Sequence, residues 1–352
     1  AIDSPVKHGR VASTKTEVRL QGQWMKYLFA AIQHRRHNLF GMADMFTRIG
    51  QVKNRQASNF LPVDDETKRT TNVSALLEKN GFKNKGKLVA MQLGASQSVR
   101  TWELEKFVET GKRLMVHPTC QDKTEIVLTG SPDEAETAKR FVSLCDYPVI
   151  NLTGQTDVLD VPVLLDRCDL LISSDTGPVH IAAARNTPVL GIYFASAYAA
   201  ETGPYGENHL VVQSEDSCNP CNEPEKCDNP KCRNAIHPDA VAQIAAHMLF
   251  SGNVEKPEVS NPDMGVYRST FLPNDTLIYY PDFSGAISER YQHGLLGRIL
   301  WEPETDLNLY LDFINQYLPQ LKKSPGFAQM LIDYRAELQN LTIIFAHAIQ
   351  WC

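Results

Sequence analysis

Short, continuously apolar runs alternate with helical stretches between about Lys87 and Leu249. Such runs are typical of strands buried on both faces, and their alternation with helices predicts parallel strands joined by crossover helices. The expected strands are 88–91, 125–128, 149–150, 170–173, 189–193 and 210–212, and the expected helices are 103–114, 133–145, 161–167, 178–185 and 239–250. The pattern therefore predicts one open, doubly wound α/β domain over residues 85–250.

Helical patterns also precede this domain. Apolar spacing predicts helices at 23–33, 42–49 and 64–80. The strands of a complete second sheet are not evident among them, because the apolar residues recur at helical rather than alternating spacing. Residues 1–84 are therefore interpreted as an incomplete N-terminal lobe followed by a linker.

The last third of the chain changes in composition. After Phe250 the sequence becomes rich in Pro, Asn, Ser and Asp as far as Pro262, which indicates a linker. Apolar stripes at 307–318 and 327–345 then predict two helices that pack through those stripes. We expect residues 251–352 to form a linker and a mainly helical tail, and no motif indicates what the tail does.

The composition is that of an ordinary globular protein of 352 residues, of which 43% are hydrophobic and 22% charged. A chain of this length is large enough for two domains. Lys and Arg number 35 against 41 Asp and Glu, and this net charge of −6 lacks the basic footprint of a nucleic-acid-binding protein. The apolar runs fall far short of the about 20 residues that a membrane-spanning helix needs. We therefore expect neither a nucleic-acid partner nor a membrane span.

The start of the chain and its cysteines bear on its location. Residues 1–5 lack the charged start and the apolar core of a signal peptide, and the first residue is Ala rather than Met, so we expect the chain to begin within a longer protein. Four of the eight cysteines lie within fifteen residues and the others are scattered. This distribution favours a local cluster in a reducing compartment over a secreted disulfide framework. The expected location is therefore the cytoplasm.

The segment Ser173–Ala184 leaves a predicted strand and opens a predicted helix. Asp175 or Thr176 is placed to cap that helix, and Pro178 suits its first turn. A helix that begins beyond the carboxyl end of a parallel strand presents unpaired N–H groups and the positive end of its dipole, so it binds phosphate or diphosphate. A capped structural helix with a core histidine is the alternative that these residues leave open. Four residues are candidates for holding the anion, namely Asp175, Thr176, Gly177 and His180.

Two further loops leave the carboxyl ends of predicted strands and enter helices. In the first, Gly94 and Ser96 permit close backbone approach, and Arg100 supplies a cation with bidentate reach to a phosphate. In the second, Gly130 is a candidate for binding the same ligand, and Glu134 is expected to favour the helix dipole ahead of contacting a ligand. Because ligands bind at the carboxyl ends of strands in open α/β sheets, we expect the three loops to converge on one site.

Five segments between about Leu61 and Leu249 carry a family resemblance, namely Arg100–Phe107, Thr129–Glu134, Leu152–Gly154, Asp175–Ala184 and Thr202–Gly206. They resemble glycosyltransferase family nine, the ADP-heptose:lipopolysaccharide heptosyltransferases. The resemblance implies the two-domain GT-B fold, in which the C-terminal domain holds the nucleotide sugar and the N-terminal domain holds the acceptor and a catalytic aspartate. It implies that the loop at 175–180 holds the donor diphosphate and sugar, with Gly94 and Ser96 lining the same pocket. The expected fold is thus α/β of GT-B type, with a doubly wound parallel-sheet donor domain, an incomplete N-terminal lobe and a helical C-terminal tail.

The resemblance implies an inverting transferase that moves a heptose or related sugar from a nucleoside-diphosphate donor to a lipopolysaccharide-type saccharide or lipid-linked saccharide. Arg100 stands where the family has a lysine, and it would stabilise the departing diphosphate as a catalytic residue. No metal or other cofactor is implied in catalysis. The implied location is the cytoplasm at the inner face of the inner membrane, with peripheral association left open.

The sequence departs from the family at its start. The family's first strand, its Gly-containing loop and its catalytic aspartate find no counterpart before 35–38, so the N-terminal domain is expected to lack its start, and the role of general base is not carried over to Asp44. Two alternatives therefore stay open. One is a non-catalytic or partner-dependent nucleotide-sugar-binding module, and the other is a GT-B sugar-nucleotide epimerase.

The cysteine cluster has the spacing C-x2-C-x5-C-x4-C in a loop rich in Pro and Asn, and it consists of Cys218, Cys221, Cys227 and Cys232. Four thiolates at this spacing can ligate one tetrahedral zinc or iron ion. Two short disulfides and four free thiols are the alternatives, and either a metal or disulfides would staple a loop with little core of its own. The resemblance implies a structural role, because similar loops ending like Ile236–Pro238 occur in the second-heptose branch of the family.

Overall fold

The computed structural model describes residues 9–12, 18–33, 35–52, 61–95, 97–222, 227–251, 261–272 and 274–283, together with 253, 257, 291, 294, 295, 298, 313, 316 and 317. The chain divides into two compact units. The first comprises residues 1–54, 271–280 and 285–352, and the second comprises residues 55–270 and 281–284.

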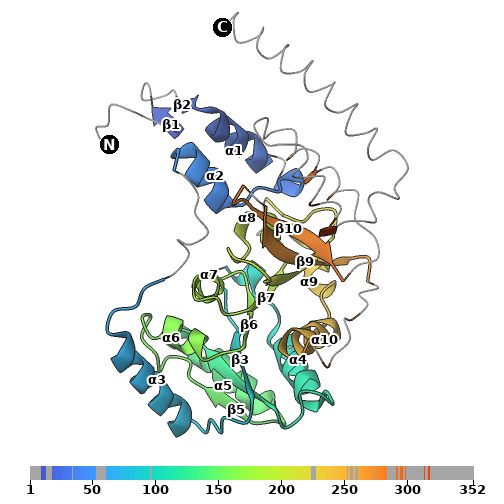
Figure 1. Cartoon of the computed structure of the whole chain (residues 1–352). Coiled ribbons are helices and arrows are strands. Elements are labelled where there is room, and N and C mark those ends of the chain that lie inside the picture. The colour runs from blue at the N-terminus through green and yellow to red at the C-terminus, as the bar shows by residue number, and fades with distance from the viewer. Residues whose placement is uncertain are drawn as a thin grey trace, which may run out of the picture. The chain divides into compact units, whose positions relative to one another are not determined.

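The second unit is built on a largely parallel sheet with the strand order β10-β9-β8-β7-β6-β3-β4-β5 (Figure 1). Neighbouring strands run parallel from β8 to β5, whereas β9 runs antiparallel to β8. The edge strand β10 is shared between the two units. The strands are β3 Lys87–Gln92, β4 Thr124–Thr129, β5 Val149–Asn151, β6 Leu170–Ser174, β7 Val189–Tyr193, β8 Leu210–Ser214, β9 Met264–Phe271 and β10 Leu277–Asp282.

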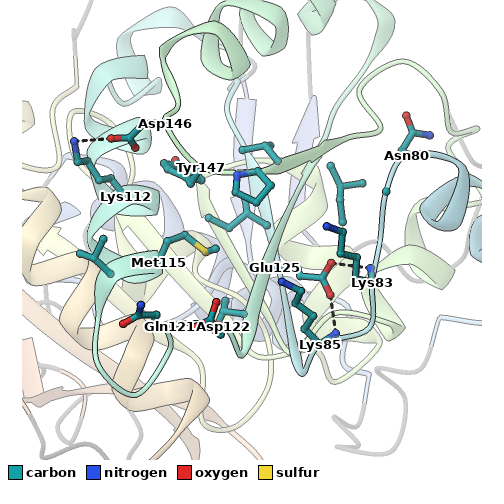
Figure 2. A pocket seen from close by; sticks show the side chains of 17 residues that line it. Asn80, Lys83, Lys85, Lys112, Met115, Gln121, Asp122, Glu125, Asp146 and Tyr147 are labelled. Atoms are coloured by element: carbon teal, nitrogen blue, oxygen red, sulfur yellow. Dashed lines mark hydrogen bonds and ion pairs between the residues drawn. The ribbon is translucent and has the colours of Figure 1, made fainter.

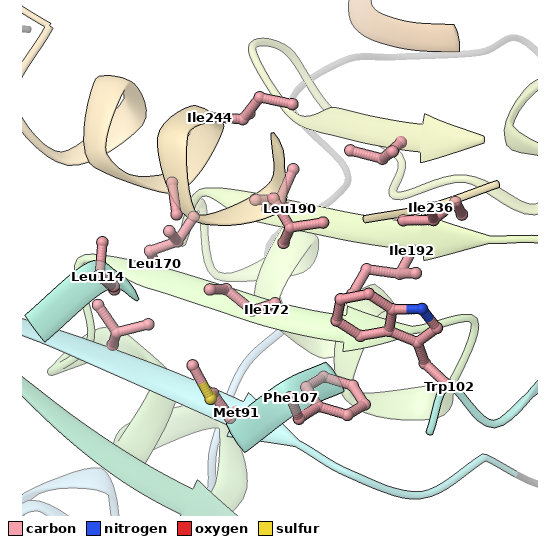
Figure 3. Close-up of a cluster of buried hydrophobic side chains, with 14 of the residues drawn as sticks. Met91, Trp102, Phe107, Leu114, Leu170, Ile172, Leu190, Ile192, Ile236 and Ile244 are labelled. Carbon is pink, nitrogen blue, oxygen red and sulfur yellow. The ribbon is translucent and has the colours of Figure 1, made fainter. Parts of the chain in front are cut away.

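Helices cover both faces of this sheet, as a doubly wound fold requires. The helices are α3 Glu66–Lys79, α4 Leu104–Val116, α5 Ala135–Leu144, α6 Val161–Asp166, α7 Gly177–Ala184, α8 Ala199–Thr202, α9 Lys231–Asn234 and α10 Pro238–Leu249. One apolar layer joins α4, α5 and α10 to side chains such as Ile172 (Figure 3). The other joins α3, α6 and α7 to side chains such as Leu171. Because side chains alternate along a strand, these two neighbours in β6 belong to opposite layers.

The strand order reverses between β3 and β6. From β3 the chain adds β4 and β5 on one side, and it then returns to add β6, β7 and β8 on the other. The two strands pair directly, from Val89 opposite Leu170 to Gln92 opposite Ser173. Their following loops lead to helices on opposite faces, and the region beyond the carboxyl ends of β3 and β6, called the crevice below, is where open α/β sheets bind ligands.

The predicted α/β pattern is confirmed, but two strands of this sheet were missed, as was a two-stranded hairpin at residues 9–21 of the first unit. Both β9 and β10 lie in the part expected to be linker and helical tail. Gly265 near the start of β9 and Pro281 within β10 argue against strands in the sequence, because glycine adds no packing side chain and proline cannot donate to a ladder. Pairing of β9 with the edge of β8 overrides these local preferences. The second unit therefore extends to Thr270 rather than ending at 250, and it begins at Arg55 because α3 packs on the sheet.

The first unit contains a hairpin, β1 (Gly9–Ala12) and β2 (Val18–Gln21), followed by helices α1 (Gln23–Gln33) and α2 (Met42–Ile49). The two helices have the predicted bounds and share a small core with the buried ring of Phe40. The ring of Phe40 meets those of Trp24 and Tyr27 edge to face, and the guanidinium of Arg48 lies over the Trp24 ring. This core therefore depends on aromatic side chains.

Two buried charges hold the first unit together. The guanidinium of Arg298 stacks over Phe40 and donates to the backbone oxygens of Leu39 and Leu277. Asp44 is fully buried, and its Oδ2 accepts the backbone N–H of Leu277 at 3.1 Å. Both residues thus link α2 and its preceding segment to β10 within this unit.

The tail helices expected at 327–345 lie outside the described residues, and of those expected at 307–318 only residues 313, 316 and 317 are described, all of them helical. In the described part of the chain, no helix combines the length and the apolar character needed to cross a membrane.

Replacing Arg185 by Met is expected to lower the free energy of unfolding by about 2 kcal/mol. Its side chain is 5% exposed and joins the end of α7 to Asp166, to Glu66 and to the backbone oxygen of Leu61. Breaking a buried pair costs about 3–5 kcal/mol, but the two carboxylates are partly exposed, so water recovers part of that cost. Urea unfolding measures the change. The matched variant Arg140→Met breaks a pair that is exposed on both sides and should cost under about 0.5 kcal/mol; equal losses would contradict the prediction.

Candidate functional site

An ion pair bridges the two loops that diverge at the strand reversal. Arg100 lies in the short turn Ser98–Arg100 after β3, and its Nη1 donates to Oδ2 of Asp175, which follows β6, at 2.6 Å. Asp175 is 5% exposed, whereas 20% of the Arg100 side chain is exposed. Thr202, at the end of α8, donates from Oγ1 to the same carboxylate oxygen at 3.4 Å. Arg100, Asp175 and Thr202 are called the Asp175 cluster below.

The Asp175 cluster holds a fixed positive charge at the crevice. A guanidinium carries five N–H donors in one plane, so its bond to Asp175 is compatible with bidentate binding of a phosphate. The buried carboxylate restricts where the Arg100 side chain can lie, and the partial exposure of that side chain keeps it accessible to a ligand. The cluster can therefore bind a phosphate with little further ordering of the arginine.

Helix α7 begins two residues after Asp175, at Gly177, and no side chain caps it. The prediction that Thr176 or Asp175 caps this helix is wrong, because Thr176 Oγ1 lies 3.0 Å from Ser173 Oγ and Asp175 pairs with Arg100. A Cβ added at Gly177 would meet no atom within 4 Å. Pro178 has no N–H and the Val179 N–H donates to the Thr176 oxygen at 3.2 Å, so the Gly177 N–H, the helix dipole and open space are what the start of α7 offers to an anion.

His180 lies one turn into α7 and is exposed. The protein packed around its ring lowers the pKa of His180 below the ordinary 6.5, and the nearby Asp175 carboxylate opposes that shift. A lowered pKa leaves the ring neutral at pH 7. A neutral imidazole has one N–H donor, which suits a hydrogen bond to a phosphate or sugar oxygen rather than charge neutralisation.

A second set of residues brings a carboxylate against two glycines. Glu134 Oε1 accepts Gln92 Nε2 at 2.7 Å, and Oε2 accepts the backbone N–H of Ser131 at 2.7 Å. A Cβ at Gly94 would lie 1.8 Å from Oε1, and one at Gly130 would lie 2.8 Å from Oε2. Gln92, Gly94, Gly130 and Glu134 are called the Glu134 notch below. Glu134 does form a capping box with Ser131. Its carboxylate also accepts the Gln92 amide and lies against Gly94 and Gly130, so its contacts go beyond the first turn of its own helix.

Two buried polar atoms near this notch have no hydrogen-bond partner within the described part of the chain. They are Oε1 of Gln92, a residue 5% exposed, and Oγ1 of Thr153, a residue 8% exposed. The Thr153 methyl lies 3.2 Å from the Cβ position of Gly130. An unpaired buried polar atom costs about 1–3 kcal/mol, so a ligand or water that pairs with these atoms would be stabilised here.

A Gly94→Ala variant is expected to bind a nucleotide ligand about tenfold more weakly. Its new methyl would overlap Glu134 Oε1, and the carboxylate would have to leave the notch and its bond to Gln92. Calorimetric titration measures the affinity. In a Glu134→Ala background the overlapping atom is absent, so the Gly94→Ala change should then have almost no effect; independent, additive losses would contradict the prediction.

The cysteine loop is tied to the segment between β7 and α8. The backbone N–H of Cys221 donates to the oxygen of Ala195 at 2.7 Å, and Asn219 Nδ2 donates to the same oxygen at 3.0 Å. The N–H of Ala195 in turn donates to the Cys232 thiol. Ala195 has φ of 54°, a left-handed conformation that these contacts hold in place. The loop thereby fixes the start of the segment that ends at Thr202 of the Asp175 cluster.

No disulfide joins the four cysteines of the loop, all of which are described. Burial and the neighbouring groups raise the pKa of Cys218 to about 11, so its thiol is protonated at pH 7. Across the residues that the structure describes, no set of three or more His, Cys, Asp and Glu side chains is arranged to hold a metal ion. The predicted zinc or iron ion gains no support from this arrangement and stays a prediction.

A cavity of about 570 Å³ lies at the other ends of the strands (Figure 2). It opens around the first residues of β4 and β5, away from the Asp175 cluster and the Glu134 notch. Among its charged groups, Lys112 pairs with Asp146 at 2.9 Å, and the Glu125 carboxylate accepts the backbone N–H groups of Lys83 and Lys85.

The structure brings most of the predicted site residues to one edge of the sheet. Ser96 lies outside the described residues. Sequence reasoning missed Thr202, Gln92 and Thr153 as site residues, although Thr202 and Thr153 lie in segments that carry the family resemblance. Gln92 ends β3, Thr153 follows β5, and Thr202 ends the short helix after β7. Their positions after the carboxyl ends of strands, rather than their residue types, could have indicated them. The predicted residues that the structure places at the carboxyl ends of the strands are Gly94, Arg100, Gly130, Asp175, Thr176, Gly177 and His180.

Comparisons with known proteins agree with this picture. A family model described as glycosyltransferase family 9 (heptosyltransferase) matches residues 5–231, which includes the segment before Leu61. The lipopolysaccharide core heptosyltransferase OpsX of Haemophilus influenzae is 30% identical over 120 residues, or 34% of this chain and 33% of that protein. Lipooligosaccharide heptosyltransferase 2 of Campylobacter jejuni is 23% identical over 180 residues, or 49% of this chain and 54% of that protein. This chain thus spans between a third and about half of these relatives.

A solved structure shares the fold. The family 9 glycosyl transferase of Veillonella parvula superposes with a TM-score of 0.53 at 20% sequence identity, and the match covers 61% of each chain. At this identity the likeness shows a common fold.

Proposed function

The chain belongs to glycosyltransferase family 9, and from this we propose that it transfers a heptose or related sugar from a nucleoside-diphosphate donor to a lipopolysaccharide-type saccharide acceptor, with inversion at the anomeric carbon. The observation that carries the proposal is the Arg100–Asp175 pair beside the uncapped start of α7. It places a guanidinium, a backbone N–H and the positive end of a helix dipole at the crevice where an open α/β sheet binds nucleotides. We place the reaction in the cytoplasm, at the inner face of the inner membrane.

The departing diphosphate is the group that this crevice serves in the proposed reaction. When the acceptor oxygen attacks the anomeric carbon, the bond from that carbon to the diphosphate oxygen breaks and negative charge grows on the diphosphate. Arg100, the Gly177 N–H and the dipole of α7 would stabilise that growing charge, because all three are in place before the reaction begins. Asp175 acts through Arg100 and is a positioning residue.

The Glu134 notch offers a place for the ribose of the donor. A carboxylate accepts hydrogen bonds from the two neighbouring hydroxyls of a ribose, and Gly94 and Gly130 let the Glu134 carboxylate lie close against the backbone of both loops. The unpaired oxygens of Gln92 and Thr153 could accept further donors of the nucleoside. Loops after β3, β4 and β6 would then hold one donor molecule from its diphosphate to its ribose.

The proposed reaction also needs a base that takes the proton of the acceptor hydroxyl. Asp44 is not assigned that role, because it is fully buried and its carboxylate accepts the backbone N–H of Leu277. A general base must come within about 3 Å of the acceptor hydroxyl. Asp44 is better explained as a structural residue of the first unit.

Calorimetric titration with ADP-heptose, ADP, UDP-glucose and GDP-mannose tests the proposal. We expect selective binding of ADP-heptose, and loss of that binding in Arg100→Ala. Mixing the donor with a lipopolysaccharide core acceptor should then release ADP, whereas release or isomerisation without acceptor would indicate an epimerase or hydrolase. Binding of none of the four nucleotides would overturn the proposed function.

A further inference from the structure

The cysteine loop ends in the short helix α9, and Arg233 of this helix reaches the turn that carries Arg100. Its Nη2 donates to the backbone oxygen of Val99, the residue before Arg100, at 3.3 Å. Its Nε lies 3.7 Å from Oε1 of Glu103, which follows the same turn. Arg233 therefore contacts the chain on both sides of Arg100.

The same guanidinium also contacts the segment that leads to Thr202. Its Cζ lies 5.7 Å from the centroid of the Phe194 ring, within the about 6 Å at which a cation is attracted to an aromatic face. Phe194 is buried, directly follows β7 and precedes Ala195, whose backbone oxygen accepts the N–H of Cys221. One side chain at the end of the cysteine loop thus contacts both the segment that carries Arg100 and the segment that carries Thr202.

Arg233 is itself held in place by a second cation. Lys106 on α4 donates from Nζ to the backbone oxygen of Arg233 at 2.8 Å, and the same Nζ lies 3.2 Å from Oε2 of Glu103. The side chains of Arg233, Glu103 and Lys106 are 28%, 33% and 21% exposed, so water screens their charges less than it screens a fully exposed pair. The helices α4 and α9 and the turn at Arg100 therefore form one connected network.

We propose that Arg233 is a positioning residue for the Asp175 cluster, and that the cysteine loop contributes to donor binding through it. The loop holds Ala195 through Cys221 near its start and Val99 through Arg233 at its end. The guanidinium of Arg100 needs a fixed position to bind a diphosphate bidentately, because its N–H donors lie in one rigid plane. A shift of the Val99 backbone moves that plane. The inference rests on the proposed function, since the diphosphate is that of the proposed donor.

Calorimetric titration of the full chain with ADP-heptose tests this role. Arg233→Met keeps an unbranched side chain beside Phe194 and removes the N–H donors and the charge. We expect the variant to bind ADP-heptose about tenfold more weakly than the parent chain, the effect of losing about one charge-assisted hydrogen bond to the diphosphate. The matched control Arg113→Met breaks the pair between α4 and Asp239 on α10, which is exposed on both sides, and should leave the affinity unchanged. Circular dichroism shows whether both variants are folded.

A second background distinguishes positioning of Arg100 from a general loss of structure. Arg100→Lys keeps the cation on a flexible stem, which reaches a phosphate from a wider range of backbone positions than a planar guanidinium does. In this background Arg233→Met should weaken ADP-heptose binding by less than about threefold. A purely structural role of Arg233 predicts the same loss in both backgrounds.

Three results would overturn the inference, namely equal losses in the two backgrounds, an equal loss in the Arg113→Met control, or unchanged affinity of a folded Arg233→Met variant. Each is read in a parent chain that binds ADP-heptose, so each leaves the proposed function standing. A parent chain that binds no nucleotide would overturn the proposed function and this inference with it.

Discussion

An Asp175→Asn variant is expected to bind the nucleotide-sugar donor at least about 100-fold more weakly than the parent chain, a loss of about 2.7 kcal/mol. The substitution keeps the shape of the side chain and removes its charge. Asp175 holds Arg100 at 2.6 Å and accepts from Thr202 at 3.4 Å, so an uncharged amide would no longer fix the guanidinium at the crevice. Calorimetric titration with ADP-heptose measures the loss.

Whether the Asp175→Asn change strengthens or weakens donor binding distinguishes two explanations for the role of Asp175. If only net charge mattered, removing a carboxylate from an anion site would strengthen binding of the diphosphate. If Asp175 positions Arg100, the same change weakens binding. Asp169→Asn is the matched control, because Asp169 precedes β6 and pairs with Lys87 at the opposite end of the strand. Unchanged affinity in a folded Asp175→Asn variant would remove Asp175 from the site.

Acidification is expected to destabilise the second unit by about 3 kcal/mol between pH 6.5 and pH 4. His209, which directly precedes β8, is 3% exposed, and burial lowers the pKa of its imidazole from 6.5 to about 4. In that interval the unfolded chain binds a proton on this residue and the folded chain does not. The free energy of unfolding therefore falls as the pH drops through the interval, and His209 has no such effect above about pH 7.

Urea unfolding at a series of pH values tests this contribution. His209 Nδ1 has no hydrogen-bond partner within the described residues, so no hydrogen bond from that part of the chain offsets the cost of a buried proton at this atom. A His209→Gln variant cannot take up that proton, and its stability should depend less steeply on pH between 6.5 and 4. Identical pH profiles for the variant and the parent chain would show that the buried imidazole does not govern this dependence.

Much of the second unit could be predicted because its strands are buried on both faces. The run 189–193 was expected as a strand and is β7, since continuous apolar character leaves few other structures open. The helices at 23–33 and 42–49 were predicted with the observed bounds. In contrast, β9 pairs with the edge of β8, which lies about 50 residues earlier in the chain. The apolar pattern of β9 itself does not indicate that pairing.

In the candidate site, too, the features formed by neighbouring residues could be predicted, and the contacts between separate loops could not. The loop at Asp175 could be found because a strand, a glycine and a helix start follow one another in the sequence. The pairing of Asp175 with Arg100 could not, since it depends on β3 and β6 being neighbours although 75 residues separate the two side chains. The role of Glu134 was underestimated for the same reason, because its contact with Gln92 joins two loops.

The reversal of strand order also ties ligand binding to the cohesion of the sheet. One half of the domain, β3 to β5, supplies Arg100 and Glu134, and the other half, β6 to β8, supplies Asp175 and Thr202. A donor held by both halves stabilises only the state in which β3 and β6 are paired, and it does so by RT ln(1 + [L]/Kd). Saturating donor should therefore slow hydrogen exchange along the seam between these two strands more than at the outer strand β5, which makes the nucleotide a clamp across the middle of the domain.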